Sequence, residues 1–325
     1  MFKEGVKPKR IISVSDVEKN PSKIYDFVGD EFTYADSFGE EWKSFSRVQS
    51  DALLKIPTSR RRLENLLGFP VEWLKEMSIL EIGSGAGRFS KILADYAKEL
   101  TTVDLSEAIF VNEAIGKPNV TFVRTDLNEN IFNKKFDLIF CRGVLQHTPN
   151  PDKSIKNLFQ YGLEGSIIIF DIYAKTSLYS RLRDWKYFYR LILKPFPNKF
   201  IQKIVGKYGE KLFHIHSFFN RLVRKFFLLR LLVRILRPLY PKLDVDLLYP
   251  TFSKKQKLDV YLSILLDVFT SKYDNPRDFN EVVNNLASIG QYPYSYNEAR
   301  CMFRVKKRNH KPFTPNIGKD GVFES

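Results

Sequence analysis

The chain has 325 residues, of which 44% are hydrophobic and 27% charged, a balance that excludes a wholly disordered protein. Its formal net charge is +15, and residues 175–242 hold 17 lysines and arginines against two acidic residues, so this segment carries the whole excess. Two cysteines, Cys141 and Cys301, are too few and too far apart for a disulfide framework or a zinc site. Because the opening MFKEGVKPKR lacks the apolar stretch of a secretory signal, we expect a cytoplasmic location.

Hydrophobic periodicity predicts helices first and then an alternation of strands and helices. Residues 40–67 are typical of two short amphipathic helices that are separated at Pro57. From residue 79 onward, apolar runs expected to form strands lie at 79–82, 100–103, 120–123, 136–141 and 166–172. Helices are expected between them, at 87–97, 106–115 and 151–161. Five strands with intervening helices predict a parallel sheet that is covered by helices on both faces.

The stretch SILEIGSGAGRFSKIL, residues 78–93, leads from a strand through three close glycines into a helix. Its spacing fits the pattern E-x-G-x-G-x-G, formed by Glu81, Gly83, Gly85 and Gly87. A dinucleotide-binding loop would need a further glycine where this chain has Arg88. Glycines let the backbone turn sharply and let a ligand lie against it, because no Cβ occupies the ligand's volume. The loop is therefore expected to form a bed for the ribose and methionine parts of S-adenosylmethionine, which has no phosphate.

An acidic residue follows each of the next two strands, as expected for a site that binds a nucleoside. Asp104 closes TTVD, where its carboxylate can accept hydrogen bonds from both ribose hydroxyls. Asp126 follows in VRTDLN, where its carboxylate can accept from the adenine amino group while the Leu127 N–H donates to the ring.

Four motifs over residues 75–174, LEIGSGAGRF, TTVDLS, VRTDLN and FDLIFCRGVLQHTPNP, resemble in this order the successive motifs of class I S-adenosylmethionine-dependent methyltransferases. The resemblance implies an α/β, Rossmann-like class I methyltransferase fold, whose seven-stranded, mostly parallel sheet ends in an antiparallel hairpin. Residues 291–296 and 299–305 are expected to form that hairpin after a helix at 278–288. The implied cofactor is S-adenosyl-L-methionine. The residues assigned to bind it are Glu81, Gly83, Ser84, Gly85, Gly87, Arg88, Asp104, Leu105, Asp126, Leu127 and Arg142.

The expected elements divide the chain into five segments. They are an amino-terminal helical cap at 1–74, the cofactor-binding core at 75–174, a basic and aromatic helical insertion at 175–262, a return to the core at 263–305 and a tail at 306–325. The insertion follows the fifth strand. Because ligands of open α/β sheets bind beyond the carboxyl ends of the strands, we expect the insertion to lie over the acceptor pocket.

Methyl transfer to a hydroxyl requires an acceptor in line with the activated methyl group and one base that removes the proton. His147, in GVLQHTPNP just past the fourth strand, is the candidate base because the pKa of an unperturbed imidazole lies near neutral pH. In the alternative interpretation, the imidazole only braces the loop through hydrogen bonds to the backbone. Cys141 is expected to be a buried strand-end residue. No compact acidic cluster accompanies Asp171 and Asp267 in the sequence, so no metal is expected.

The insertion mixes basic residues with aromatic and aliphatic ones. FFNRLVRKFFLLRLLVRILRPLY, residues 218–240, has a longest uncharged run of only four residues, so it cannot span a bilayer. On a helical wheel its basic residues change face near residue 228, which predicts a bend or break there. Three interpretations stay open: a packed lid, contact with an anionic membrane surface, and binding of nucleic acid, which the apolar character of the segment disfavours.

Two flanking stretches, FGEEWKSFSRVQSD (38–51) and LLDVFTSKYDNPRDFNEVVNNLASIGQYPYSY (265–296), resemble bacterial methyltransferases encoded with enzymes of surface-glycan and secondary-metabolite biosynthesis. This resemblance implies that Trp42 caps the cofactor and that Asp267 and Tyr273 line the acceptor side. It favours O-methylation of a sugar or other hydroxyl in a glycan, including a lipid-linked glycan, by a protein that is cytoplasmic or peripheral on the inner membrane face. The alternatives are a methyltransferase of a quinone or another lipophilic small molecule, an RNA methyltransferase and a non-enzymatic scaffold.

Overall fold

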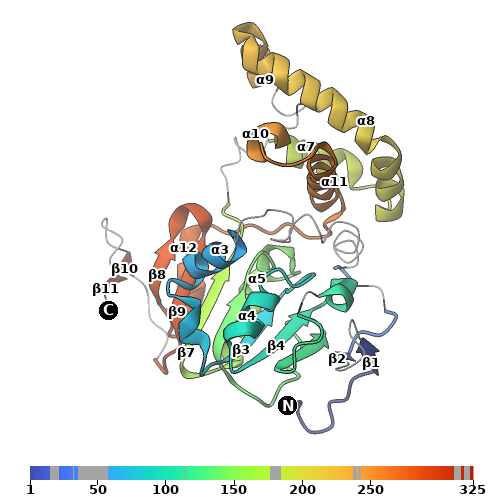
Figure 1. Cartoon of the computed structure of the whole chain (residues 1–325). Coiled ribbons are helices and arrows are strands. Elements are labelled where there is room, and N and C mark those ends of the chain that lie inside the picture. Colours follow the sequence, from blue (N-terminus) through green and yellow to red (C-terminus); the bar gives the residue numbers. More distant parts are fainter. Residues whose placement is uncertain are drawn as a thin grey trace. The chain divides into compact units, whose positions relative to one another are not determined.

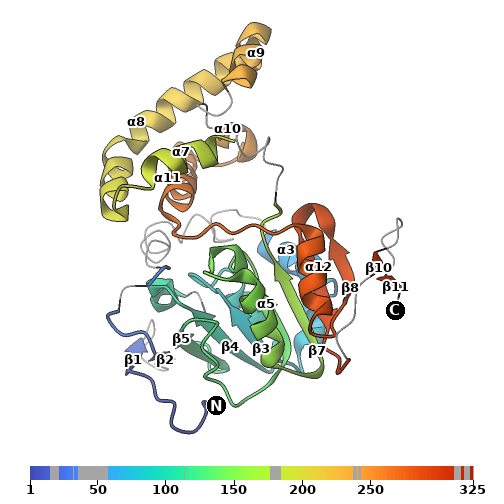
Figure 2. The same ribbon diagram turned by 180° about the vertical axis from the view of Figure 1, so that it is seen from behind.

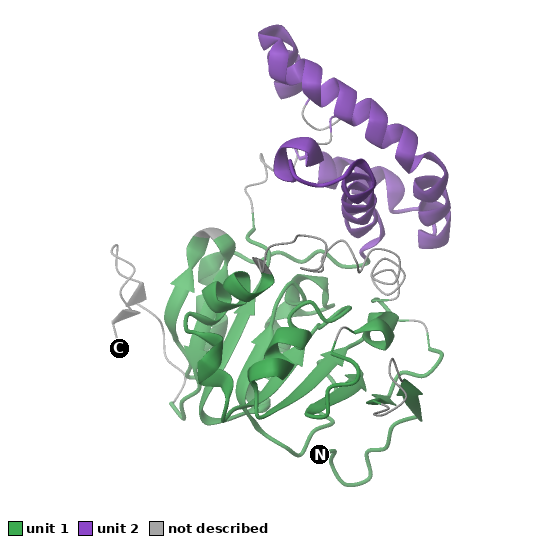
Figure 3. Ribbon diagram, in the orientation of Figure 1, with its two compact units in different colours: residues 1–43, 56–175, 272–325 green, residues 44–55, 176–271 purple. Residues whose placement is uncertain are grey.

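The computed structural model describes residues 1–14, 22–31, 33–35, 58–112, 114–175, 184–236, 240, 243–310, 316–317 and 323–324. The chain divides into two compact units (Figure 3): unit 1 comprises residues 1–43, 56–175 and 272–325, and unit 2 comprises residues 44–55 and 176–271. The insertion therefore extends past the boundary expected at 262, because the helix that begins at Lys254 continues to Thr270. The chain returns to the core unit only from residue 272.

The central sheet of unit 1 is made of parallel strands. They are β3 (Ser78–Ile82), β4 (Glu99–Asp104), β5 (Val120–Arg124), β6 (Phe136–Cys141) and β7 (Gly162–Asp171). Their spatial order is β5-β4-β3-β6-β7. Figure 1 labels β4, β3 and β7 of this series. Next to β7, β9 (Met302–Lys306) runs antiparallel both to β7 and to β8 (Pro293–Asn297). The predicted Rossmann-like sheet with mostly parallel strands and a terminal antiparallel hairpin is thus confirmed.

Two strands that the sequence analysis missed extend the sheet at its other edge. β1 (Arg10–Val14) runs antiparallel to β2 (Ser22–Asp26), which pairs in parallel with β5. The described residues of unit 1 therefore form a sheet of nine strands rather than seven. β2 buries Ile24 while Lys23 is exposed, a period-two pattern that is too short to stand out in the sequence.

The prediction of a helical cap over residues 1–74 was therefore wrong for its first part, which contributes strands. The described helical structure of this segment consists of α3 (Thr58–Leu67) and the short 3-10 helix η2 (Val71–Leu74). Trp42 and the first of the two helices expected within 40–67 lie outside the described residues.

Helices cover both faces of the sheet, as predicted (Figures 1 and 2). α3 and α4 (Ser90–Tyr96) contribute to the core on one face, whereas α5 (Pro151–Gln160) and α12 (Phe279–Ala287) contribute to the core on the other. Ile79 and Leu80 are neighbours in β3 but belong to different cores, because successive side chains of a strand point to opposite faces.

The helix expected at 106–115 is shorter in the structure. The 3-10 helix η3 (Glu107–Val111) ends at Asn112, which is buried. The side-chain oxygen of Asn112 accepts a hydrogen bond from the Ala114 N–H at 2.9 Å, and its amide donates to Ser90 Oγ at 3.1 Å. An asparagine that bonds the backbone ahead of it competes with the hydrogen bonds that would continue a helix.

The described elements of unit 2 are α7 (Trp185–Leu193), α8 (Asn198–Lys225), α9 (Phe227–Ile235), α10 (Val245–Leu248) and α11 (Lys254–Thr270). The core of the unit includes side chains of α8 and α11, namely Ile201, Val205, Phe213, Tyr261 and Leu265. Gly209 lies on the same buried face of α8, and a Cβ at this position would come within 2.3 Å of Leu262 Cδ2. A larger residue at this position would therefore have to displace the Leu262 side chain.

The break predicted near residue 228 is present at Phe226, between α8 and α9. This residue has extended backbone angles, with φ at −110° and ψ at 121°. The Arg230 guanidinium donates to the carbonyl oxygens of Val223 at 3.2 Å and Arg224 at 2.6 Å, so it satisfies two of the last carbonyls of α8. Within the part of the chain that is described, every helix falls short of the length and apolar character needed to cross a bilayer.

Candidate functional site

The glycine loop follows β3 and folds back over β4. The Gly83 N–H donates to the Val103 carbonyl oxygen at 2.7 Å. Gly83, Gly85 and Gly87 have φ values of 75°, 54° and 88°, a region of backbone conformation that glycine adopts without strain. A Cβ on Gly83 would lie 1.9 Å from Val144 Cγ2, so only glycine fits between β3 and the loop after β6.

Asp104 connects the glycine loop to the loop after β4. Its Oδ2 accepts a hydrogen bond from the Gly85 N–H at 2.7 Å, and its Oδ1 accepts from the N–H and the hydroxyl of Ser106 at 2.8 and 2.6 Å. Burial raises the pKa of this carboxyl group, and the hydrogen bonds to its charged form offset only part of that effect. Oδ2 retains the capacity for a further hydrogen bond, as binding of a ribose hydroxyl requires.

Glu81 lies near the end of β3, just before the glycine loop. Its side chain is buried, and its Oε2 accepts a hydrogen bond from Ser90 Oγ at 2.5 Å, in the first turn of α4. Burial raises the pKa of Glu81 to about 7. The carboxyl group thus ties the end of β3 to the helix that follows the loop, which is the geometry of a residue that positions the loop.

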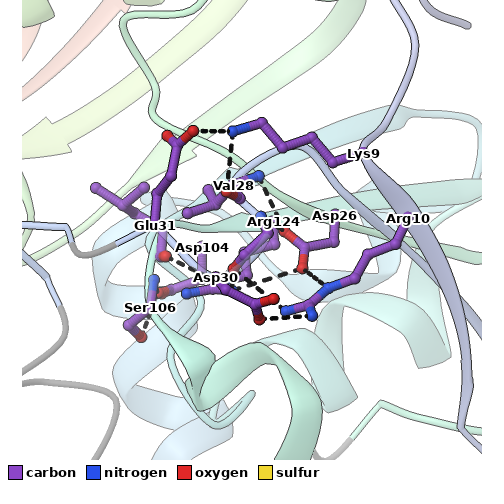
Figure 4. Close-up of polar contacts among 11 residues, drawn as sticks. Lys9, Arg10, Asp26, Val28, Asp30, Glu31, Asp104, Ser106 and Arg124 are labelled. Carbon is purple, nitrogen blue, oxygen red and sulfur yellow. Dashed lines mark hydrogen bonds and ion pairs between the residues drawn. The ribbon is translucent and has the colours of Figure 1, made fainter.

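A buried polar cluster holds the loop after β4 (Figure 4). The Arg124 guanidinium, at the end of β5, donates to the carbonyl oxygens of Gly29 at 2.8 Å and Leu105 at 3.3 Å, and it lies 3.5 Å from Asp26 Oδ2. Burial acts to raise the pKa of Asp26, but hydrogen bonds from the Gly29 N–H and the Arg10 guanidinium outweigh burial and lower it. Leu105, predicted to bind the cofactor, is therefore fixed through the amino-terminal strands.

Asp126 has a partner that sequence reasoning missed. Its Oδ2 accepts from the Tyr34 hydroxyl at 2.7 Å, and its Oδ1 accepts from the N–H and the side-chain amide of Asn128 at 2.8 and 3.0 Å. Burial, together with the nearby carboxylate, raises the pKa of Tyr34. The Tyr34 ring packs edge-on against Tyr273, with 5.6 Å between ring centres. The amino-terminal segment therefore contacts both the residue expected to bind adenine and one expected to line the acceptor side. Leu127, next in the chain, is buried.

Two arginines of the predicted site lie against Phe89. The guanidinium carbons of Arg88 and Arg142 are 5.6 and 5.8 Å from the centre of its ring. Arg88 Nε donates to Ser59 Oγ at 3.0 Å. Arg142 Nε is buried and lies 3.6 Å from Asp171 Oδ2. The two groups form an ion pair, but this distance is too long for a hydrogen bond. Of the two side chains, Arg142 therefore has a buried donor whose hydrogen bond is unmet within the described residues.

His147 lies in the 3-10 helix η4 (Leu145–His147), directly after β6. Its Nδ1 is 3.0 Å from the Tyr273 carbonyl oxygen, and its ring packs edge-on against Tyr173 with 5.5 Å between centres. A carbonyl oxygen can only accept, so this contact places the proton on Nδ1 and makes Nε2 the basic nitrogen. The Asn275 N–H also donates to the Gln146 carbonyl oxygen at 2.8 Å, and the Asn275 side-chain amide donates to the Thr148 carbonyl oxygen at 2.9 Å. Three hydrogen bonds among the described residues thus tie this loop to residues 273–275.

The second resemblance assigned three residues to ligand contact, and the structure brings one of them to the site. Tyr273 lies beside His147 and Tyr34. Asp267 lies on α11 in unit 2, where its main-chain carbonyl accepts a hydrogen bond from Ser271 Oγ at 2.5 Å. A role for Asp267 at the acceptor side, and the position of the insertion over the pocket, stay predictions. Trp42 lies outside the described residues.

The loop after β6 also holds a buried glutamine that sequence reasoning missed. Gln146 is 0% exposed, and its Oε1 and Nε2 both lack a hydrogen-bond partner among the described residues. Ser84 Oγ, in the glycine loop, shares this property. Buried polar groups nearly always have hydrogen-bond partners. Atoms without partners in the loops after β3 and β6 therefore fit a site in which a polar ligand provides the missing hydrogen bonds. The sequence signal for this buried glutamine is weak, because it consists of one polar residue after two apolar ones in the run VLQ.

A family model described as a methyltransferase domain matches residues 57–214, which include the glycine loop, Asp104, Asp126 and His147. Over these residues the chain is similar to S-adenosylmethionine-dependent methyltransferases. The match to this methyltransferase domain begins just before α3 and ends within α8. S-adenosylmethionine is the cofactor of the class. The positive-φ glycines, the acceptor capacity of Asp104, and the atoms of Ser84 and Arg142 that lack a hydrogen bond among the described residues fit this cofactor.

Curated relatives of the methyltransferase domain include two kinds of O-methyltransferase. The chain is 32% identical over 131 residues to malonyl-(acyl-carrier protein) O-methyltransferase 2 of Ilyobacter polytropus, covering 38% of this chain and 50% of that protein. It is 34% identical over 91 residues to the ubiquinone biosynthesis O-methyltransferase of Coxiella burnetii, covering 26% of this chain and 38% of that protein. The chain thus spans half or less of the length of these two relatives. Among solved structures, the N-methyltransferase NodS of Bradyrhizobium japonicum in complex with S-adenosyl-L-homocysteine is 23% identical, covering 41% of this chain and 74% of that chain, with a TM-score of 0.32.

Proposed function

We propose that the chain transfers the methyl group of S-adenosylmethionine to the oxygen of an acceptor hydroxyl. The observation that carries this proposal is the combination, within unit 1, of a glycine loop closed on Asp104 and a histidine whose Nδ1 is engaged by the Tyr273 carbonyl. The first accounts for a nucleoside cofactor and the second for a base. The two curated relatives, both named as O-methyltransferases, support an oxygen acceptor.

The cofactor would be held at the carboxyl ends of β3, β4 and β5. Asp104 would accept from the ribose through Oδ2, and the backbone at Gly85 and Gly87 would leave room for the amino-acid part. Asp126 already accepts from Tyr34, so the adenine amino group would share this carboxylate with the tyrosine hydroxyl. When bound, the cofactor supplies a methyl group that is activated by its attachment to a sulfonium.

The proton of the acceptor hydroxyl would go to Nε2 of His147 as the oxygen attacks. The Tyr273 carbonyl keeps the other ring proton on Nδ1, so the imidazole is held in the tautomer that can act as a base. Proton removal by a positioned base contributes about 10²–10⁴-fold to the rate of such reactions. The same hydrogen bond braces the loop, so one side chain can serve both roles that the sequence analysis left open.

Two acceptor classes share this chemistry. The flanking sequences favour a sugar hydroxyl of a glycan, including a lipid-linked glycan. The likeness to a ubiquinone biosynthesis enzyme favours a hydroxyl of a lipophilic ring compound. In both classes the product is a methyl ether.

The cofactor assignment is tested by the affinity of the purified chain for S-adenosyl-L-homocysteine. Replacing Asp104 with alanine removes an ionised acceptor for the ribose, so Asp104→Ala is expected to weaken binding by about 1.5–3 kcal/mol, or about ten- to a hundredfold. Asp95→Ala, which removes an exposed carboxylate from α4, is the control and should leave the affinity unchanged. Equal affinities of wild type and Asp104→Ala in calorimetry would refute the placement.

The acceptor assignment is tested with S-adenosylmethionine that carries a labelled methyl group, offered with phenolic and oligosaccharide acceptors. The labelled product is then treated with mild alkali, which cleaves methyl esters to methanol but leaves methyl ethers intact. Label retained on a phenolic or sugar oxygen is the expected result. Label released as methanol, or found on nitrogen, contradicts a hydroxyl acceptor.

A further inference from the structure

Helix α8 carries a four-residue repeat that the proposed function does not use. Residues 199–214 read KFIQ-KIVG-KYGE-KLFH, so each repeat begins with a lysine. These lysines are all exposed: Lys199, Lys203, Lys207 and Lys211. The apolar or aromatic residue after each lysine is also exposed: Phe200 (46%), Ile204 (37%), Tyr208 (44%) and Leu212 (37%). The third residue of each repeat is buried: Ile201, Val205, Gly209 and Phe213.

Helix geometry arranges this repeat into three stripes. Residues four apart differ by about 40° around an α-helix of 3.6 residues per turn, so each class of residue follows one slowly winding line. The buried stripe includes Gly209, which faces Leu262 on α11. The lysine stripe and the exposed apolar stripe lie next to each other along the helix. After the fourth repeat, Ile215 takes the position that lysine holds in the repeats, and Ile215 and Phe218 are 59% and 58% exposed.

Helix α9 adds a second exposed apolar surface. Phe227 and Leu228, just after the break at Phe226, are 72% and 77% exposed. Further large apolar side chains of α9 are exposed at Leu231, Leu232 and Ile235, whereas Val233 is buried. The helix sequence FLLRLLVRI has two arginines and no acidic residue. A contiguous series of exposed apolar side chains of this kind marks a surface that binds something.

The composition of this surface fits a bilayer with anionic headgroups better than other partners. Long lysine stems and the neighbouring apolar side chains can enter the headgroup boundary together, while the ammonium groups meet lipid phosphates. Lysine is depleted from protein–protein interfaces, so a dry protein partner fits poorly. A nucleic acid would engage the cations but would leave the leucines and isoleucines of α8 and α9 in water.

We propose that α8 and α9 form a docking surface for anionic lipid bilayers, with the helices lying in the headgroup region rather than crossing the membrane. The lysines of α8 supply Coulomb attraction, and Phe227 with Leu228 supplies apolar insertion. Since the proposal stands on exposure, spacing and charge within unit 2, it goes beyond the methyltransferase reaction and does not rest on it. Salt weakens the Coulomb part but leaves the apolar part in place.

The test is co-sedimentation of the full chain with vesicles of phosphatidylcholine alone or mixed with phosphatidylglycerol. Wild type is expected to bind the mixed vesicles and to keep part of that binding at high salt. Replacing Lys199, Lys203, Lys207 and Lys211 with glutamine should weaken binding roughly a hundredfold or more, at about fivefold for each lysine near the surface. The matched control replaces four exposed lysines of unit 1, Lys75, Lys98, Lys153 and Lys156, and should bind nearly as wild type does.

A second variant, Phe227→Ser with Leu228→Ser, separates the apolar part from the charge. Both side chains are largely exposed, so the variant should fold and keep its affinity for S-adenosyl-L-homocysteine. It is expected to bind mixed vesicles at low salt and to lose the binding that survives high salt. Equal binding by the α8 variant and its unit 1 control would overturn the proposal. So would binding of an RNA oligomer without binding of vesicles, or no binding of either.

Discussion

The two units handle polar and apolar groups in opposite ways. In unit 1, the buried carboxylate of Asp26 lies near the guanidinium groups of Arg10 and Arg124. Arg124 also donates hydrogen bonds to backbone carbonyls of two separate loops. In unit 2, α9 exposes most of its large apolar side chains and buries only Val233 among its described residues. A buried cluster of charged groups thus holds one edge of unit 1, whereas exposed apolar side chains form part of the surface of unit 2.

This contrast indicates that side chains from several elements converge on the candidate site of unit 1, whereas the exposed surface of unit 2 follows from residue spacing along its helices. The glycine loop, Asp104 and His147 depend on contacts that converge from several strands of one sheet. The stripes of α8 depend on nothing beyond a helix and its spacing. Substitutions at these converging contacts of unit 1 should therefore change stability, ligand affinity or turnover, while substitutions on the outer faces of α8 and α9 should change none of these.

The largest effect on stability is expected from Arg124→Met. Among the described residues, this change leaves the fully buried Asp26 with Arg10 as its remaining cation, and it removes the donor to Leu105. Breaking a buried ion pair by removing one partner costs about 3–5 kcal/mol. Urea unfolding should show this loss, and affinity for S-adenosyl-L-homocysteine should fall with it. Arg10→Met, at a side chain that is 37% exposed, is the matched control and should cost less. Equal losses in the two variants would contradict the organising role of Arg124.

A pH-dependent effect of up to about 3 kcal/mol is expected from Glu81. Burial raises its pKa from 4.5 to about 7, so the folded protein holds a proton that the unfolded chain has already released. The stability from this proton is complete below pH 4.5 and is lost as the pH rises through about 7. Glu81→Gln keeps an acceptor for Ser90 but cannot ionise, so its free energy of unfolding should change less across this window. Urea unfolding below and above the window measures the difference, and parallel curves for wild type and variant would show that Glu81 is ionised throughout.

His147 is expected to affect turnover by about 10² or more, with little effect on cofactor affinity. Two variants separate proton removal from bracing. His147→Ala removes both ring nitrogens, whereas the amide of His147→Asn can replace Nδ1 as donor to the Tyr273 carbonyl but offers no base at the place of Nε2. Loss of kcat in both variants supports a base. Recovery of activity and thermal stability in His147→Asn would show that the histidine only braces the loop.

The strands that carry the site could be predicted from the sequence because each is an apolar run bounded by turn residues. The run expected at 79–82 became β3 (Ser78–Ile82), and the one expected at 136–141 has the same bounds in β6. The glycine pattern and the strand-end aspartate at 104 were equally local signals, since they require a few residues at fixed spacing.

The contacts that shape the site could not be predicted, because their partners are far apart in the chain. Tyr34 reaches Asp126 across 92 residues, and Arg124 reaches Gly29 across 95. Periodicity over a short window carries no information about such pairs. The burial of Gln146 has the same origin, since a glutamine in a loop is normally exposed.

The smallest effect on stability is expected from Gln146→Met. This variant tests whether the buried carboxamide of Gln146 forms hydrogen bonds with a ligand in the site. Methionine has a similar volume and no polar atoms that need partners. Because Oε1 and Nε2 of Gln146 are buried without partners among the described residues, removing them should stabilise the protein without ligand by about 1 kcal/mol. If the carboxamide binds cofactor or acceptor, the same change should lower affinity or turnover.

Gln291→Met is the matched control for this last prediction. Gln291 is also buried, at 5% exposed, but its Oε1 accepts from the Arg308 N–H at 3.0 Å and its Nε2 donates to the Arg308 carbonyl at 2.5 Å. Nε2 also donates to the Ile289 carbonyl at 3.3 Å, so the replacement removes the side-chain partner of three backbone groups. It should destabilise the protein by about 1–3 kcal/mol and leave turnover unchanged. Opposite signs of the two stability changes, measured by urea unfolding, support the assignment of Gln146 to the site. A loss of stability in Gln146→Met as large as that in Gln291→Met would mean that Gln146 is satisfied within the protein, and that the site does not need its carboxamide.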